Sequence, residues 1–140
     1  MYDITALGEI LIDFTYQGIG RNGQKLFAQN PGGAPANALT SAARFGAKTA
    51  FLGKAGTDMH GRFLKEILEK EQIDTRGFIL DERYFTTLAF VDLSPEGERT
   101  FSFARKPGAD TQITEKELDM EKLKEVGPIR ELTQEEIFGY

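Results

Sequence analysis

The sequence predicts an α/β fold in which a layered α/β domain carries a small β appendage. Through residues 4–70, apolar patterns typical of strands and of helices alternate, which is the order that builds a sheet covered by helices. Residues 86–103 then hold two strand-like runs in succession, the pattern of an antiparallel hairpin. With 140 residues, 40% of them hydrophobic, one compact domain is expected.

The first strand is expected at residues 4–14, a nearly continuous apolar run with Gly8 in its middle. Such a run is typical of a strand that is buried on both faces, so we place it centrally in the sheet. Residues 18–30 are polar and glycine-rich, with Leu26 and Phe27 as their apolar pair. They predict a loop or an exposed hairpin.

Two helices and a strand are expected next. Residues 34–45 are rich in alanine and follow a Pro-Gly-Gly sequence, while Gly46 supplies a stop signal, so they predict a helix. Residues 49–53 predict a short strand. Residues 58–70 predict a second helix, because their apolar residues recur at helical spacing. Its buried stripe is expected to be Phe63, Leu64, Ile67 and Leu68.

The last part of the chain predicts strands and then acidic helices. Residues 86–93 and 99–103 are strand-like, and the proline and glycine between them predict a hairpin turn. Residues 115–126 and 133–138 show acidic helical patterns on either side of Gly127-Pro128. We expect a divergent acidic helical tail over residues 119–140.

Composition excludes several classes of function. The net charge of −5 and the pI near 5.0 argue against a nucleic-acid partner, which would demand a basic surface. The absence of cysteine excludes disulfides and thiolate zinc sites, and it fits a reducing compartment, so the cytoplasm is expected. No signal peptide and no apolar run of membrane-spanning length is present, so no membrane association is expected.

One glycine motif is predicted to carry no chemistry. Residues 18–23 match the dinucleotide-binding pattern GxGxxG, but no helical pattern follows them to hold a pyrophosphate, so a flexible turn is expected. No Walker-type Gly-Lys-Ser/Thr sequence exists in the chain.

Residues 32–38 (GGAPANA) form the most informative motif. Glycines let a ligand approach the backbone, a helix start offers free N–H groups, and Asn37 can both donate and accept hydrogen bonds. Asp13 ends a predicted strand, where open α/β sheets bind ligands. These features suit a polyol site. A glycine turn with an incidental Asn37, and Asp13 as a loop cap, remain the alternatives.

Taken together, these motifs resemble the opening of ribokinase-like sugar kinases, the PfkB family. The matching runs are residues 8–13 (GEILID), 32–38, 45–47 (FGA) and 53–61 (GKAGTDMHG), while residues 105–110 (RKPGAD) resemble the fructokinase branch. The resemblance spans residues 3–118. It implies a ribokinase-like three-layer α/β sandwich, incomplete in this chain, with a small β lid. It also implies phosphorylation of a sugar by magnesium-ATP.

The resemblance implies a role for each matching residue. Asp13, Gly32, Gly33 and Asn37 match the positions that bind sugar hydroxyls, and Phe103 and Arg105 match substrate contacts on the lid. A solvated surface charge is the alternative for Arg105. The lid would comprise residues 14–30 and 86–104, and its exposed apolar side chains predict a homodimer through the lid. His60 is expected to be exposed, and the pair Asp58 and Gly61 to cap a helix.

The resemblance also identifies what the chain does not carry. The family takes its catalytic aspartate from a Gly-Ala-Gly-Asp motif, whereas this sequence offers only Pro107-Gly108-Ala109-Asp110. We therefore expect no catalytic, ATP-binding or metal-binding residue in this chain, and we predict that it is inactive alone. ATP and Mg²⁺ are expected for the full-length family member.

Two functions follow as hypotheses. The first is a fructokinase-like sugar kinase of which this chain supplies the sugar-binding part. The second is a catalytically silent remnant that binds a sugar or a protein. The acceptor could be fructose, ketodeoxygluconate, another ketose or a nucleoside.

Overall fold

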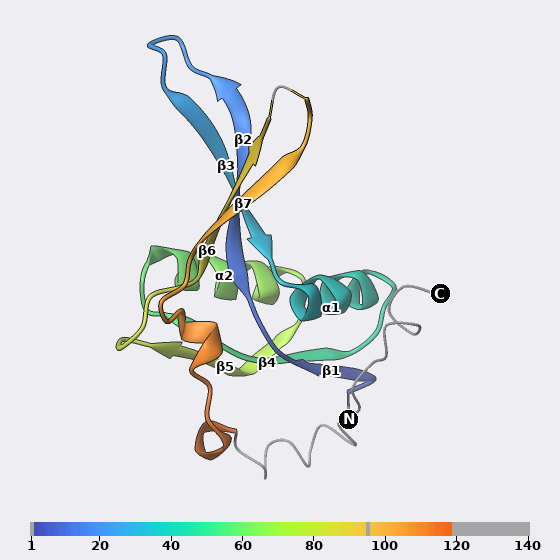
Figure 1. Cartoon of the computed structure of the whole chain (residues 1–140). Helices are drawn as coiled ribbons and strands as arrows, with labels where there is room; N and C mark the ends of the chain where they lie inside the picture. Colours follow the sequence, from blue (N-terminus) through green and yellow to red (C-terminus); the bar gives the residue numbers. More distant parts are fainter. Residues whose placement is uncertain (1, 95, 119–140) are drawn as a thin grey trace.

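The computed structural model describes residues 2–94 and 96–118, which form a body and a projecting arm (Figure 1). The body sheet contains β1 (Ile4–Leu7), β4 (Thr49–Gly56) and β5 (Asp74–Asp81), all parallel, in the order β1-β4-β5. Every residue of β4 is buried, as expected for a central strand. Helices α1 (Ala34–Arg44) and α2 (Met59–Lys70) pack against this sheet. The predicted α/β class is confirmed.

The arm is a four-stranded sheet, which we call the lid sheet. It consists of β2 (Leu11–Ile19), β3 (Lys25–Gly32), β6 (Leu88–Leu93) and β7 (Arg99–Ala104), in the order β3-β2-β6-β7. Two hairpins, β2-β3 and β6-β7, are joined through a parallel pairing of β2 with β6. Short 3₁₀ turns, η1 (Ala109–Thr111) and η2 (Glu115–Glu117), follow the lid sheet along the chain.

The prediction of a single strand over residues 4–14 is wrong. The chain leaves the body sheet after Leu7, and a new strand begins at Leu11 in the lid sheet. Ile10 and Ile12, only 1% and 0% exposed, pack into the core at the junction of the two sheets. The chain is therefore apolar at the end of β1 and at the start of β2. Hydrophobic periodicity cannot show that one strand ends and another begins between Leu7 and Leu11.

Other boundaries also differ from the sequence prediction. Residues 18–30 form a hairpin, which was one of the two alternatives, and the strand expected at 49–53 extends to Gly56. Strand β5 has no counterpart in the prediction, because Asp74, Arg76 and Asp81 interrupt its apolar pattern. Of the predicted helix 115–126, the described part forms only the turn η2, and its remainder lies outside the described residues, as does 133–138.

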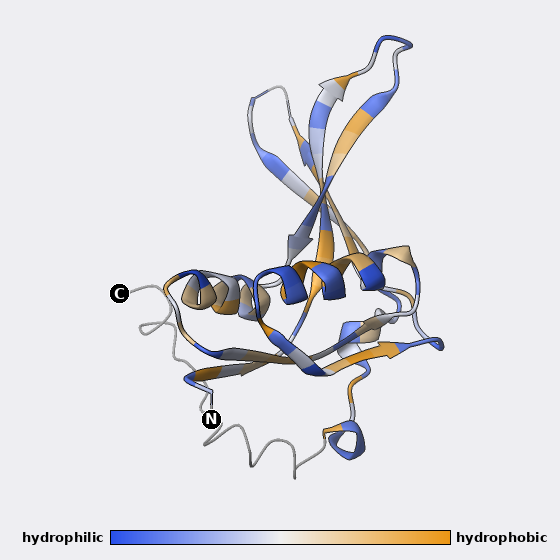
Figure 2. Cartoon of the chain, turned by 180° about the vertical axis from the view of Figure 1, so that it is seen from behind, coloured by the Kyte–Doolittle hydropathy of each residue, from blue (hydrophilic) through white to orange (hydrophobic). Residues whose placement is uncertain are grey.

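The core lies between the two helices, the body sheet and the base of the lid sheet. Helix α2 carries hydrophilic residues on its outward side (Figure 2). The buried residues of the two helices are Ala36 and Leu39 of α1 and Gly61, Leu64 and Leu68 of α2. Leu64 and Leu68 of the predicted stripe are fully buried, while Phe63 and Ile67 are half-buried. The cluster of buried apolar side chains comprises Ile10, Ile12, Ala36, Leu39, Phe51, Ala55, Leu64, Leu68, Ile73 and Phe78.

Asp58 caps α2, as predicted. Its Oδ1 accepts hydrogen bonds from the backbone N–H groups of His60 (3.0 Å) and Gly61 (3.1 Å). Its Oδ2 accepts from the backbone N–H of Thr86 (2.8 Å), just before the lid strand β6 begins. The cap therefore also fixes the point at which the chain enters the lid sheet.

Lys54 is a fully buried cation in β4. Its Nζ donates to Asp81 Oδ2 (2.9 Å), to Glu117 Oε1 (2.6 Å) and to the backbone carbonyl of Gln112 (3.0 Å). Burial by itself would lower the pKa of Lys54, but the bonds to Glu117 and Asp81 outweigh burial and raise it. This network ties the segment after the lid sheet to two strands of the body.

Among the described helices, none combines the length and the apolar character needed to cross a bilayer.

Candidate functional site

Asp13 lies near the base of the lid sheet, in a row of residues that runs across three strands. It pairs in register with Ala89 of β6, which pairs in turn with Phe103 of β7. Paired residues of neighbouring strands point to the same face, so the predicted sugar-binding residues Asp13 and Phe103 share one face, two strand spacings or about 10 Å apart.

The Asp13 carboxylate is half-buried and has no hydrogen-bond partner within residues 2–94 and 96–118. Burial raises its pKa, and the neighbouring Glu9 carboxylate raises it further. A Cβ atom on Gly32 would lie 2.3 Å from Asp13 Oδ2, so any other residue here would have to displace this carboxylate. The structure therefore brings Asp13 and Gly32 together, as the sequence predicts.

Gly33 forms the start of α1. Its φ of 112° favours glycine, and a Cβ atom here would lie 2.5 Å from the backbone oxygen of Glu9. No side chain caps this helix start. Its first-turn N–H groups can therefore donate to a ligand.

Asn37 is the predicted site residue that lies apart from Asp13. It is exposed and lines a separate recess of about 320 Å³ between α1 and α2, whose rim also carries the ion pair of Arg44 with Glu71. Asn37 and Asp13 line different hollows of the surface.

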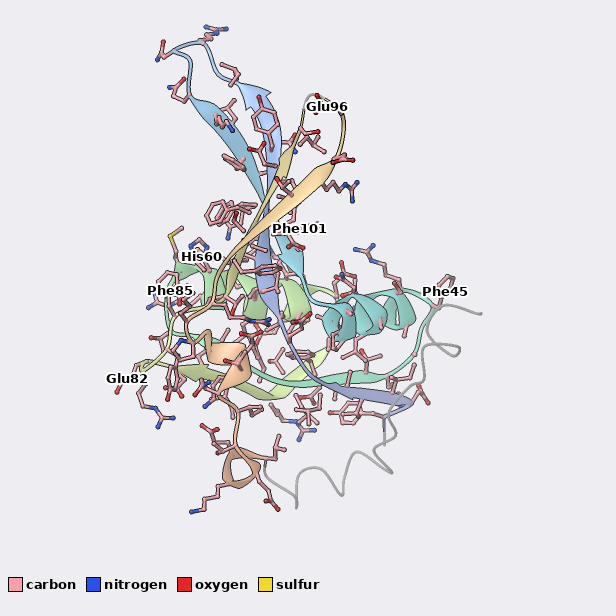
Figure 3. All side chains as sticks on the ribbon, viewed as in Figure 1. Phe45, His60, Glu82, Phe85, Glu96 and Phe101 are labelled. Carbon is pink, nitrogen blue, oxygen red and sulfur yellow. The ribbon has the colours of Figure 1, made fainter. Side chains whose placement is uncertain are left out.

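A groove of about 270 Å³ runs along the lid face that carries Asp13. The next row of the sheet beyond Asp13 contributes Thr15, Val91 and Phe101. Figure 3 shows Phe101 on β7 and Glu96 at the tip of the same hairpin. The groove is lined by Asp13, Thr15, Tyr16, Val91, Leu93, Arg99 and Phe101.

Arg105 follows β7 and is held by two carboxylates at the base of the lid sheet. Its Nη2 donates to Glu9 Oε2 (2.8 Å) and to Asp110 Oδ2, while its Nε is buried without a partner among the described residues. Bonds to Asp110 and Glu9 raise the pKa of Arg105. It is half-buried in an ion-pair cluster, not a solvated surface charge. Sequence reasoning missed Glu9, although it lies inside the motif 8–13.

The Asp110 side chain is buried and hydrogen-bonded to two other side chains. Its side chain is 1% exposed, its Oδ1 accepts a hydrogen bond from the Thr87 hydroxyl, and its Oδ2 accepts from Arg105. Gly108 is required beside it, because a Cβ atom there would overlap the Thr87 hydroxyl. Both carboxylate oxygens are therefore engaged within the described residues.

The opposite face of the lid sheet is anchored to the body by a series of aromatic rings. Successive ring centroids lie 5.2–6.0 Å apart. His60 is half-buried in this series and accepts a hydrogen bond from Gln29 Nε2 (3.2 Å), so the expectation that it is exposed is wrong. Figure 3 shows His60 and Phe85 at the base of the lid sheet. The rings are, in order, Phe85, His60, Phe14, Phe90 and Phe27.

Comparison with known proteins connects this chain to carbohydrate kinases. The family described as pfkB family carbohydrate kinase matches residues 1–133. Fructokinase-1 of Oryza sativa subsp. japonica is 43% identical over 123 residues, which are 86% of this chain and 38% of that protein. The chain thus spans well under half the length of this relative.

Among solved structures, fructokinases are also similar to this chain. Fructokinase with bound ATP from Xylella fastidiosa has a TM-score of 0.79 and 37% identity, covering 85% of this chain and 38% of that one. Fructokinase from Vibrio cholerae O395, bound to fructose, ADP and a calcium ion, has a TM-score of 0.71 and 34% identity, covering 81% and 35%. The predicted ribokinase-like fold and the predicted family are confirmed.

Proposed function

We propose that the chain, which belongs to the pfkB family of carbohydrate kinases, supplies the sugar-binding part of a fructokinase-like enzyme that phosphorylates fructose. The observation that carries the proposal is the unpaired Asp13 carboxylate above Gly32, at the base of a lid sheet. The fructose-bound relative from Vibrio cholerae supports the choice of sugar.

The geometry suggests how a sugar would be held. The Asp13 carboxylate would accept hydrogen bonds from sugar hydroxyls, and the backbone around Gly32 and Gly33 would allow the ring to approach closely. Phe103, 54% exposed on the same face, would cover an apolar face of the sugar. We also assign Arg105, at the base of the lid sheet, to the sugar site. A sugar-binding role for Asn37 stays a prediction from the motif, because Asn37 lines a separate recess between α1 and α2.

ATP and Mg²⁺ are proposed as the phosphoryl donor and its metal ion, on the basis of the ATP-bound relative from Xylella fastidiosa. Residues 2–94 and 96–118 contain no group of three or more His, Asp or Glu side chains placed to hold a metal ion.

A catalytically silent sugar-binding protein is the second candidate. The observation that favours it is the engagement of both oxygens of Asp110 by Thr87 and Arg105. The two candidates differ in whether the native protein releases ADP when it is given fructose and magnesium-ATP. With either function, we propose that the protein is cytoplasmic.

Replacing Asp13 by Asn tests the sugar site. In the native protein, Asp13→Asn should weaken fructose binding by about 1.5–3 kcal/mol, roughly 10- to 100-fold, because a charge-assisted acceptor is lost. Calorimetry measures the affinity. Asp92→Asn, on the same sheet but at the exposed Lys25 pair, is the matched control and should leave the affinity unchanged. Equal affinities for the two variants would remove Asp13 from the site.

We propose that the lid sheet also forms a homodimer. Phe101 and Phe103 are 55% and 54% exposed and stack on each other, and Leu93 is 48% exposed, so this face offers apolar area to a second copy. Sedimentation of the native protein at tens of micromolar should show a dimer, and Phe101→Ser should shift it toward the monomer. A wild-type monomer would contradict the proposal.

A further inference from the structure

The first turn of α2 contacts both hairpins of the lid sheet. Asp58 Oδ2 accepts hydrogen bonds from the backbone N–H (2.8 Å) and the hydroxyl (3.0 Å) of Thr86, which lies two residues before β6. His60 accepts a hydrogen bond from Gln29 of β3, and its ring meets the Phe14 ring of β2 edge-on, with centroids 5.7 Å apart. The hairpins β6-β7 and β2-β3 are therefore tied separately to one helix start.

The contact between Asp58 and Thr86 is closely packed and charged. Thr86 is 1% exposed, and its hydroxyl also accepts a hydrogen bond from the Gly56 N–H (3.0 Å). A Cβ atom on Gly56 would lie 2.1 Å from Asp58 Oδ2, so a larger residue there would have to displace the carboxylate. Burial by itself would raise the pKa of Asp58, but hydrogen bonds from Thr86, Gly61 and His60 outweigh burial and lower it. The bonds to Thr86 are therefore made by a charged acceptor.

This contact leads along the chain to the row of the lid sheet that contains Asp13. The carbonyl of Thr87 accepts a hydrogen bond from the Ile12 N–H (3.0 Å). Ala89, three residues beyond Thr86, pairs in register with Asp13. A strand rises about 3.3 Å per residue, so this row lies roughly 10 Å from the contact. A shift of Thr86 would therefore move β6 and the row in which Asp13 lies.

We infer that Asp58 is a positioning residue for the sugar site, because through Thr86 it fixes β6, and with β6 the row of Asp13, relative to the body. This inference rests on the proposed sugar site. Both Asp58 oxygens are engaged by the protein, so the residue acts on the sugar through the lid sheet. Its Oδ1 caps α2 and its Oδ2 holds Thr86, so the two roles can be separated by substitution.

Asp58→Asn separates the contact with Thr86 from the helix cap. Asn keeps an oxygen for the helix N–H groups and caps helices as well as Asp does, but its amide nitrogen cannot accept from the Thr86 N–H. In the native protein, Asp58→Asn should weaken fructose binding at least about threefold by calorimetry. It should also speed amide hydrogen exchange in Leu88–Leu93 at least about threefold relative to Thr49–Gly56, measured by mass spectrometry.

Three further variants serve as partner and controls. Thr86→Val removes the hydroxyl and should change both measurements in the same direction, whereas Thr86→Ser keeps the hydroxyl and should resemble the wild type. Ile73→Ala creates a cavity in the core, away from the lid sheet. It should lower the urea midpoint of unfolding and leave the fructose affinity unchanged.

The inference requires both effects of Asp58→Asn. An unchanged affinity or an unchanged exchange ratio overturns it, and Thr86→Val decides in the same way if Asp58→Asn does not fold. Equal weakening by Ile73→Ala also overturns it, because general loss of stability would then explain the effect. A wild type that binds no fructose overturns the proposed function together with the inference, while the exchange ratio still shows whether Asp58 holds β6.

Discussion

The 140-residue chain, produced alone and supplied with fructose and magnesium-ATP, is expected to release no ADP above the blank. Phosphoryl transfer requires a carboxylate that takes the hydroxyl proton and donors that stabilise the developing charge. Asp110, in the sequence Pro-Gly-Ala-Asp, has both oxygens engaged by Thr87 and Arg105, so we expect it not to take that role. Loss of base catalysis costs roughly 10²–10⁴-fold in rate, and loss of charge stabilisation a comparable factor.

A fructokinase relative assayed beside the chain provides the positive control, and a coupled assay for ADP gives the rate. If turnover is seen, Asp110→Asn tests whether Asp110 is responsible for it. If the chain releases ADP and Asp110→Asn abolishes it, Asp110 is the catalytic base and the structural role assigned to it here is wrong.

Lys54→Met is expected to destabilise the native protein by about 3–5 kcal/mol, which is the cost of removing one partner from a buried ion network. Methionine keeps most of the side-chain volume but leaves the Gln112 carbonyl without its donor. Asp81 then keeps only Arg83, and Glu117 keeps only Thr114 and its longer ion pair with Arg83. Urea unfolding measures the change in the free energy of unfolding.

Lys25→Met is the matched control for that experiment, because Lys25 also pairs with an aspartate at 2.8 Å, but on the exposed lid tip. Exposed ion pairs contribute about 0–1 kcal/mol, so this variant should unfold close to the wild-type midpoint. Similar effects of the two substitutions would show that the Lys54 network contributes no more than a surface pair.

The fold could be predicted from the sequence wherever helical periodicity and capping signals agreed. Helix α2 is an example, since Asp58 and the spacing of Leu64 and Leu68 indicate its start and its buried face. The division of residues 4–14 between two sheets could not be predicted, because Ile10 and Ile12 are buried in a junction that only the tertiary structure creates. Strand β5 could not be predicted because charged residues interrupt its apolar pattern, and the partner that buries one of them, Asp81, is Lys54, 27 residues away.

The candidate site also has a part that could be predicted from the sequence and a part that could not. Glycines at positions 32 and 33 and the carboxylate at 13 could be predicted, because close backbone approach restricts residue type and therefore leaves a motif. The Glu9–Arg105–Asp110 cluster could not, since its members come from separate segments and pair only when the lid sheet returns to the body. The position of Asn37 also depends on the rotation of α1, which the motif does not specify.

Strand β2 belongs to the body at one end and to the lid sheet at the other. Its start at Leu11 and Ile12 is buried in the core, and the Ile12 N–H donates to the Thr87 carbonyl (3.0 Å), while Ile19 at its far end is 59% exposed. No flexible linker therefore separates lid from body, and the lid cannot swing about a free pivot. Any movement of the lid sheet relative to the body would therefore have to bend continuous strands, and the bulge between Tyr16 and Gly18, where the ladder shifts register, is the irregular point along β2.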